Sequence, residues 1–196
     1  SGDDNVIIGY DAESSGATTD NEIVIGKGAA GQGANKTVIG NTSTLGAHVY
    51  GLRTPVTAIT GDTSITANDS GETFVFNDAD GAVITLPDSG GGDLTGVYFN
   101  FYIAVTITSN SHKVVCTDTT NEKLYGQLHA VDADADASSS IWAAQAGDSF
   151  SAITTDGTTK AQIGSHFTVT NMAADVWHVT GNIHCAGTPA TPFATS

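Results

Sequence analysis

The densest group of potential metal ligands is an acidic stretch in the middle of the chain. It places three carboxylates at alternate positions, Asp132, Asp134 and Asp136. Calcium prefers oxygen ligands from closely spaced acids, so this stretch is a candidate calcium site. An EF-hand loop would place a glycine after the third acid and a glutamate at its end, whereas Ala137-Ser138-Ser139 follows here. The sequence therefore favours a solvated acidic loop.

A second group combines histidines with a thiol near the C-terminus. His166, His178 and His184 are close in sequence, and Cys185 follows the last of them. Three histidines and a thiolate can hold zinc, and a trimer presents even one inward histidine three times around its axis. Because the spacing contains no compact pair such as His-x-His, the sequence favours ordinary hydrogen-bonding residues at the ends of strands. No metal and no other cofactor is expected.

Carboxylates can also work in pairs, as in glycoside hydrolysis. Almost all acids of this chain, however, lie in predicted turns beside Gly, Ser or Asn, where Asp is favoured because it bonds to its own backbone. No nucleophile elbow and no phosphate-binding loop occurs in the sequence. The sequence therefore predicts that the protein is not an enzyme.

Aromatic side chains are the remaining candidates for ligand binding, because exposed rings form platforms on which sugars stack. The rings considered are Tyr50, Tyr125, Trp142 and Trp177. Trp177 lies inside an alternating run, which predicts a place in the core. Trp142 is next to Ile141 and close to a long predicted loop, so it is the better candidate for an exposed glycan-binding residue.

Composition and charge set the fold class and exclude some partners. The 196 residues include 23 glycines, and helix-favouring runs of Leu, Glu, Lys and Ala are missing, which predicts an all-β fold. The 21 acids outnumber the 6 bases, giving a formal charge of −15, so nucleic acid and anionic membrane surfaces would be repelled. An acidic surface keeps a crowded assembly soluble, and adaptation to a saline setting is the alternative explanation.

The sequence favours neither membrane insertion nor a disulfide bond. No stretch approaches the ~18 apolar residues of a membrane span, so insertion is not expected. Cys116 and Cys185 both lie in strand-like runs. Two such thiols are more often buried small hydrophobes than a bridge, so the sequence favours free thiols over a disulfide.

The N-terminal part repeats one short phrase. The copies are Val6-Ile7-Ile8-Gly9, Ile23-Val24-Ile25-Gly26 and Thr37-Val38-Ile39-Gly40. Each β-branched run closed by glycine predicts one strand and one turn, and such a rung cannot bury its apolar face without stacking on neighbours. Within one chain there is little to stack on, so we expect β-roll or β-helix-like rungs over residues 1–53, shared in a trimer. The trimer-forming residues would be Ile7, Ile8, Val24, Ile25, Val38 and Ile39.

The composition of the chain changes at Gly51-Leu52-Arg53-Thr54-Pro55, where the glycine periodicity ends, which predicts a domain boundary. Strands separated by Gly, Asp and Asn turns follow, typical of an antiparallel β-sandwich or jelly roll over residues 54–196. Residues 77–81 have the length of a hairpin loop. The clearest strand covers 97–108, with Phe99, Phe101 and Ile103 on one face. Residues 126–140 are expected to form a surface loop.

The Ile-Gly phrases resemble the head repeats of trimeric adhesins and the related repeats of bacteriophage fibre proteins. This likeness rests on Asn5-Val6-Ile7-Ile8-Gly9, Glu22-Ile23-Val24-Ile25-Gly26 and Lys36-Thr37-Val38-Ile39-Gly40. The remainder is similar to the C-terminal modules of phage tail fibres, head fibres and capsid decorations. The residues concerned are 65–74, Val83-Ile84-Thr85-Leu86-Pro87, Trp177-His178-Val179-Thr180-Gly181 and 191–196.

The resemblance implies a homotrimer on an extracellular virion surface, in contact with other capsid or tail proteins. Its function would be structural: display, stabilisation or adhesion to a host. The alternative that remains open is a receptor- or glycan-binding module of a tail fibre, whose partner is a host cell-surface glycan or protein. A polysaccharide depolymerase and a bacterial trimeric adhesin are less well supported. Long parallel β-helices of depolymerases would not fit this chain, and the sequence shows no helical stalk or membrane anchor.

Overall fold

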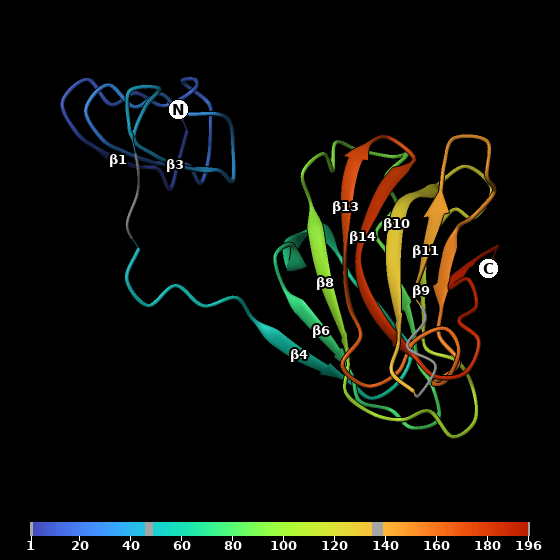
Figure 1. The fold of residues 1–196 in the computed structure, drawn as a ribbon. Coiled ribbons are helices and arrows are strands. Elements are labelled where there is room, and N and C mark those ends of the chain that lie inside the picture. Colours follow the sequence, from blue (N-terminus) through green and yellow to red (C-terminus); the bar gives the residue numbers. More distant parts are fainter. Residues whose placement is uncertain (1, 46–48, 135–138, 196) are drawn as a thin grey trace. The chain divides into compact units, whose positions relative to one another are not determined.

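The computed structural model describes residues 2–45, 49–134 and 139–195 (Figure 1). The chain divides into two compact units, Ser1–Leu52 and Arg53–Ser196. Strands make up 39% of the structure and helices 2%, which confirms the predicted all-β class. The helical part is a single 3₁₀ turn, η1 (Ala67–Asp69), among the described residues.

In the described part of the N-terminal unit, the strands form one parallel sheet in the order β1-β2-β3. The strands are β1 (Val6–Ile8), β2 (Ile23–Ile25) and β3 (Thr37–Ile39), one in each repeated phrase. Their register places equivalent residues of the phrases side by side. The closing glycine is required where the turns stack: Gly9 has φ +140°, and a Cβ there would lie 2.4 Å from the carbonyl oxygen of Gly26.

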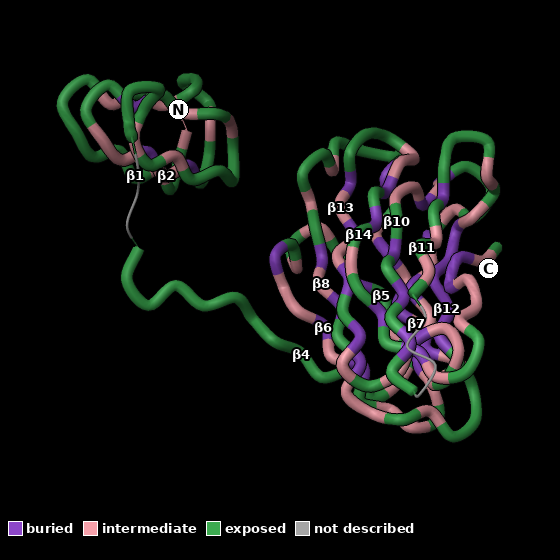
Figure 2. The backbone as a smooth tube through the Cα atoms, in the orientation of Figure 1, coloured by how far each residue is buried: buried purple, intermediate pink, exposed green. Residues whose placement is uncertain are grey.

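The N-terminal unit has little core of its own. Among its described residues, the fully buried apolar side chains are Val24 and Ala29, and the acid Glu22 is buried beside them. Figure 2 shows this unit with few buried positions, in contrast to the C-terminal unit, whose strands alternate between buried and exposed residues. The repeats therefore provide backbone pairing but leave most of their aliphatic side chains at the surface.

The described residues of the C-terminal unit form two sheets, which we call the large sheet and the small sheet. The large sheet has the order β11-β10-β14-β13-β8-β6-β4, and the small sheet has the order β15-β12-β9-β7-β5. In the large sheet the strands are β4 (Val56–Ile59), β6 (Thr73–Phe76), β8 (Tyr98–Ile103), β10 (Lys123–Asp132), β11 (Ser139–Ala144), β13 (His166–Ala173) and β14 (Val176–Cys185). In the small sheet they are β5 (Thr63–Ser64), β7 (Val83–Thr85), β9 (Lys113–Val115), β12 (Ala152–Thr154) and β15 (Phe193–Ala194).

The first six strands of this unit alternate between the two sheets. Strands β4, β6 and β8 are parallel neighbours in the large sheet, and β5, β7 and β9 are parallel neighbours in the small sheet. The chain crosses over and returns in the same direction, which makes successive strands of a sheet parallel. The expectation of an antiparallel sandwich is therefore wrong for this half, and so is the hairpin expected at 77–81, because β6 and β7 belong to different sheets.

Antiparallel pairing dominates the second half. Strand β13 pairs antiparallel with β8 and β14, β10 with β11, and β12 with β9 and β15. Strand β14 runs parallel to β10 along ten paired positions. Strand β10 occupies much of the segment expected to be a loop at 126–140. The prediction is wrong for residues 126–132, because Leu124, Leu128 and Ala130 alternate as buried residues, while Gly126, at φ +129°, interrupts the pattern in the sequence. Residues 135–138 of the expected loop lie outside the described residues.

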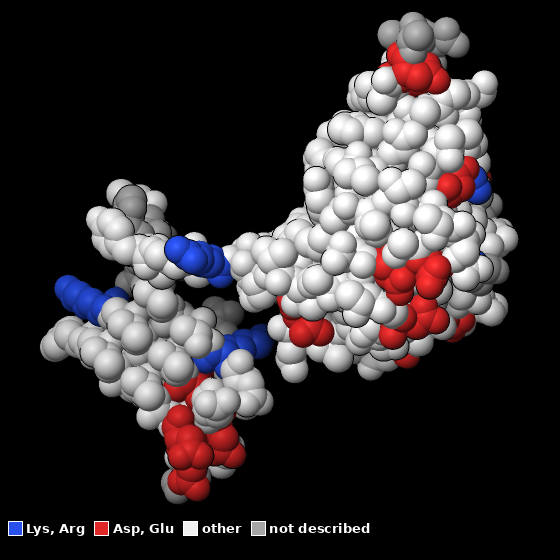
Figure 3. Space-filling model, turned by 90° about the horizontal axis from the view of Figure 1, so that it is seen from below, with Lys and Arg blue, Asp and Glu red and all other residues white. Residues whose placement is uncertain are grey.

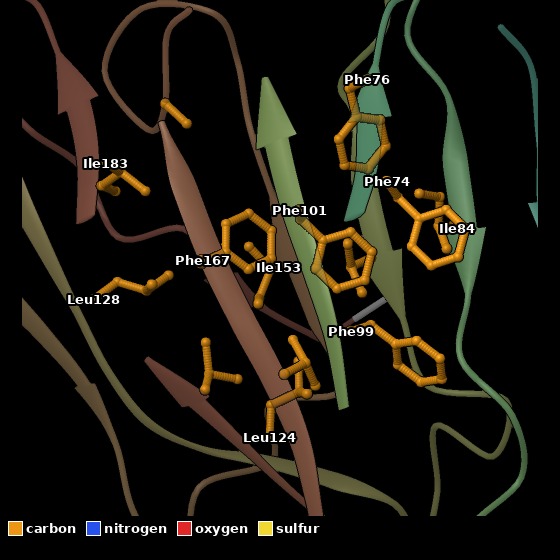
Figure 4. Packing of buried hydrophobic residues seen from close by; sticks show 14 of the residues in the cluster. Phe74, Phe76, Ile84, Phe99, Phe101, Leu124, Leu128, Ile153, Phe167 and Ile183 are labelled. Carbon is orange, nitrogen blue, oxygen red and sulfur yellow. The ribbon is translucent and has the colours of Figure 1, made fainter. Parts of the chain in front are cut away.

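The core lies between the two sheets and is rich in phenylalanine. The ring of Phe101 packs against Phe167 with centroids 5.2 Å apart and against Phe74 at 5.9 Å. These rings lie together with aliphatic side chains from both sheets, including Ile84 and Ile153 (Figure 4). The predicted inward face of 99–103 is confirmed, although β8 ends at Ile103 instead of continuing to residue 108.

Candidate functional site

The described acids of the acidic stretch accept hydrogen bonds from backbone groups of the same chain. Asp132 is buried at the end of β10 and accepts a hydrogen bond from the backbone N–H of Asp134 at 3.1 Å. Asp134 accepts one from the backbone N–H of Gly187 at 2.6 Å. Asp136 lies outside the described residues. Across the part of the chain that the structure describes, no three His, Cys, Asp or Glu residues are grouped so as to hold a metal ion.

The histidines and the cysteine of the second candidate group lie on opposite faces of the large sheet. His166, His178 and His184 are exposed on β13 and β14, whereas Cys185 is fully buried. Cys116 is buried as well, and both thiols are free, as the sequence favours. Burial raises the pKa of Cys116 to about 12 and that of Cys185 to about 11. The three imidazoles and the thiol therefore do not converge on one site.

The tryptophans are both tied to the core. Trp177 is fully buried, as predicted, and its Nε1–H donates to Glu122 at 3.1 Å. Trp142 is only half-buried on β11 but packs against the core, and its Nε1 is buried without a hydrogen-bond partner among the described residues. The expectation that Trp142 forms an exposed platform does not match this placement. Of the two tyrosines considered, Tyr125 is half-buried and Tyr50 is 98% exposed outside any strand.

The six residues expected to form a trimer contact divide between the two faces of the N-terminal sheet. Ile7, Val24 and Val38 form one row across the sheet. The next row contains Ile8, Ile25 and Ile39, which we call the isoleucine ladder. Within one chain Ile8 is 56% exposed and Ile39 is 57% exposed, with Ile25 half-buried between them. An exposed row of branched aliphatic side chains is a candidate contact surface.

One surface feature was not predicted from the sequence. It is the outward face of the four central strands of the large sheet, β10, β14, β13 and β8, which we call the carboxylate-free face. Its residues are Tyr125, Gln127, His129, Val131, His178, Thr180, Asn182, His184, His166, Thr168, Thr170, Tyr98, Asn100 and Tyr102. None of these described residues is charged at neutral pH when histidine is counted as neutral.

The register brings these residues together from distant parts of the chain. His129 is paired with Asn182, Asn182 with His166, and His166 with Tyr102, so the four form one row across the strands. A hollow at one end of the row is lined by Gln127, His129, Ile141, Thr180, Gly181 and Asn182. Lys123, at the start of β10, marks the margin, where its ammonium donates to the carbonyl oxygens of Thr119 and Thr120.

The carboxylates of the C-terminal unit lie elsewhere, mostly in turns. Figure 3 shows them in separate groups with uncharged surface between them. Many cap their own turns: Asp118, for example, accepts hydrogen bonds from the Nδ2–H of Asn121 and from the backbone N–H groups of Asn121 and Thr120, which hold its pKa below the ordinary value. An acidic chain thus keeps one broad sheet face free of acids.

Two buried acids, Glu122 and Glu22, are held by hydrogen bonds from neighbouring residues. Burial raises the pKa of Glu122, but hydrogen bonds outweigh that effect and leave its pKa below the ordinary value. The donors are the hydroxyl and backbone N–H of Ser89 at 2.6 and 2.8 Å, the backbone N–H of Asp118 at 2.8 Å and Trp177 Nε1–H. Glu22 similarly accepts hydrogen bonds from Ser14 Oγ–H at 2.8 Å and from the backbone N–H of Gly33 at 3.0 Å. Neither acid faces an open site.

Comparison with known proteins gives no independent indication of function. No protein-family model matches this chain, and neither a curated protein nor a solved structure is significantly similar to it. Within the described residues, none of the helical structure has the length and apolar character that crossing a membrane would demand.

Proposed function

We propose that the protein is a non-enzymatic structural component of a phage virion surface that assembles as a homotrimer through its N-terminal unit. The observation that carries the proposal is the exposed isoleucine ladder on a unit with almost no core. In a single chain, Ile8 and Ile39 remain more than half exposed. Association of several copies would remove this apolar surface from water, at roughly 25 cal/mol for each Å² buried.

The size of the N-terminal unit supports association. Units of about 50 residues bury a small fraction of their surface and are marginally stable on their own, so a partner stabilises them markedly. Here the described apolar residues that are fully buried are Val24 and Ala29. The unit also presents open sheet edges at β1 and β3, whose unpaired backbone groups suit strand pairing with further chain.

The trimeric state and the virion location are supported by the resemblance of the Ile-Gly repeats to trimeric adhesin heads and phage fibre proteins. The strongly acidic surface suits a crowded particle exterior, because like charge limits unspecific aggregation. The role is display and stabilisation of the larger C-terminal unit, and on a fibre this role includes adhesion to a host.

The test is the mass of the full chain in solution, measured by light scattering after size-exclusion chromatography. We expect three times the 19.9 kDa of one chain. The Ile8→Asp variant should dissociate, because it places a charge on the ladder at a position already exposed in the single chain. Thr18→Asp adds the same charge at an exposed turn of the same unit and should remain trimeric. A monomeric wild-type chain would overturn the proposal.

A further inference from the structure

We infer that the carboxylate-free face is the surface through which the C-terminal units of different copies pack against one another. The inference rests on the proposed assembly of several copies and names a second contact within it. Its partner is a second copy of this chain.

The composition of the face is that of an interface centre. Protein interfaces are depleted of Asp, Glu and Lys at their centre and enriched in aromatic residues. The face carries Tyr98, Tyr102 and Tyr125 together with four of the chain's six histidines. Tyr98 and Tyr102 are 39% and 38% exposed, so their rings stand at the surface of a single chain. Flanking strand β11 adds Ile141, which is 64% exposed.

Several polar groups of the face have no hydrogen-bond partner among the described residues. The side chains of Gln127, His129, Thr180 and Asn182 make no hydrogen bond to any other residue that the structure describes, and they line the same hollow. Elsewhere on the face, Thr168 Oγ–H donates to Asn100 Oδ1 at 2.9 Å. Such donors and acceptors can be satisfied across an interface, where about one hydrogen bond per 100–200 Å² is typical.

Charge selects a second copy as the partner. The chain carries a formal charge of −15, so two copies repel wherever their acidic surfaces approach. A contact between copies therefore requires a face without carboxylates. A basic partner would instead be drawn to the acidic surfaces, and an anionic partner would require Lys or Arg, of which Lys123 at the margin is the described example on this face.

The dimensions of the carboxylate-free face are those of a small contact. Its four strands are spaced by about 4.8 Å, so the face is roughly 19 Å wide. With three or four outward residues along each strand, the face is about 20 Å long, or close to 400 Å² in projection. This is about half of the approximately 800 Å² that each partner contributes to a standard interface, so the face suits copies that are already held together elsewhere.

The covalent link between the units lowers the affinity that the face must supply. Residues 49–55, which lie directly before β4 and include Tyr50 and Leu52, are exposed and outside any strand. Once the N-terminal units associate, the linked C-terminal units meet at a high effective concentration, typically in the millimolar range for short flexible links. A polar face that is too weak to associate in isolation is then sufficient.

A cysteine placed on the face tests the inference in the full chain. The native thiols are buried, at 2% exposure for Cys116 and 0% for Cys185, so a new surface thiol is the reactive one. Thr180→Cys lies at the centre of the face, and Thr188→Cys lies at an exposed bend of the same unit. We expect alkylation of Thr180→Cys to be at least about tenfold slower than that of Thr188→Cys, as for a site open in under a tenth of the population. Adding Ile8→Asp should remove this difference.

The outcomes separate this inference from the proposed function. If the chain has a trimeric mass but both thiols react equally fast, the inference is overturned and the proposed function stands. A monomeric mass overturns the proposed function and the inference with it. Slow alkylation that persists in the dissociated Ile8→Asp variant shows that the site is covered within one chain, against the inference. Fast alkylation that slows only on adding purified bacterial capsular polysaccharide assigns the face to a glycan and likewise overturns it.

Discussion

The N-terminal and C-terminal units both begin with parallel strands, but only the C-terminal unit encloses the side chains of those strands. In the N-terminal unit, β1, β2 and β3 pair in one sheet, and the described apolar residues that become fully buried are Val24 and Ala29. In the C-terminal unit, β4, β6 and β8 are also parallel, yet they face a second parallel set, β5, β7 and β9, across a phenylalanine core.

The difference shows that parallel backbone pairing does not by itself create a hydrophobic core. The ladder satisfies backbone hydrogen bonds in both units, but hydrophobic stabilisation requires a second layer. The C-terminal unit supplies this layer from its own chain by crossing between sheets. For the N-terminal unit, we propose that other copies supply it. Substitutions that affect one unit and not the other can test this contrast.

The largest effect is expected in the core of the C-terminal unit. Phe101→Ala removes a ring that contacts Phe74, Phe76 and Phe167, and should lower the free energy of unfolding by about 3–5 kcal/mol. Both tryptophans lie in this unit, so fluorescence during denaturant titration follows its unfolding alone. Tyr50→Ala, at an exposed ring, is the matched control and should leave the transition in place. Equal losses in the two variants would contradict this account of the core.

A smaller effect is expected from the stacking of turns in the N-terminal unit. Gly9→Ala places a Cβ against the Gly26 carbonyl at a φ of +140° and should cost about 1–3 kcal/mol. Hydrogen exchange of the Gly26 amide, which bonds to the Ile8 carbonyl at 2.8 Å, reports this loss locally. In Gly16→Ala the new Cβ meets its closest neighbour, Thr19 Oγ1, at 3.4 Å, so exchange should stay as in the wild type. Unchanged protection in Gly9→Ala would show that the turns do not need glycine.

Acid should weaken the C-terminal unit first, through His112. This side chain is fully buried and stacked on Phe76 at 4.6 Å, with its Nδ1 accepting from the Ala82 backbone N–H. Burial lowers its pKa despite the opposing effect of Asp78. The unfolded chain therefore takes up the proton more readily, and stability falls as the pH drops below 6.5, by at most about 1.4 kcal/mol per pH unit for one proton.

The measurement is the denaturant midpoint at pH 7.5 and at pH 5, followed by tryptophan fluorescence. His112→Asn retains an acceptor for the Ala82 N–H without a group that titrates in this range, so its midpoint should change less between the two pH values. Thr188→Asn alters an exposed bend of the same unit, outside the carboxylate-free face, and should behave like the wild type. A wild-type midpoint that is the same at both pH values would rule out this role for His112.

Much of the local structure can be predicted from the sequence, because it depends on nearby residues. The repeated phrases contain the strands β1, β2 and β3, and the alternation around Phe99 and Phe101 gives the correct inward face. Strand β10 could not be predicted, since Gly126 and small residues interrupt the alternation of apolar and polar residues in its sequence. The crossovers between sheets could not be predicted either, because a loop such as 77–81 has a suitable length for either connection.

The candidate face could not be predicted for a related reason. His166, His178 and His184 attract attention in the sequence, but His129 and Tyr102 join them only through the strand order β10-β14-β13-β8. That order depends on pairings between segments far apart in the chain. The identity of a polar outward residue in one strand does not indicate which residues lie beside it on the neighbouring strands. The absence of carboxylates becomes visible only when the strands are assembled.

The smallest expected effect is the response of the N-terminal unit to acid, which should occur at lower pH than that of the C-terminal unit. Burial of Glu22 raises its pKa, but hydrogen bonds from Ser15, Ser14 and Gly33 outweigh it and bring the pKa from 4.5 to about 2. A carboxylate with a lowered pKa stabilises the fold above its unfolded value, and that contribution is lost as the pH falls from 4.5 towards 2. Because its donors come from the turns before β2 and before β3, the charged form ties successive repeats together.

Protection factors of the Ser15 and Gly33 amides, which correct for the intrinsic effect of pH on exchange, can follow this change. They should hold from pH 7 to about 4.5 and then decline. Glu22→Gln imitates the protonated acid, so these amides should be less protected already at pH 7 and should respond less to acid. Glu13→Gln removes an exposed carboxylate of the same unit and should retain the wild-type profile. Loss of protection near pH 6 would mean that both units are sensitive to acid in the same pH range, which would remove the contrast between them. A decline confined to low pH would show that a buried carboxylate compensates for the missing core.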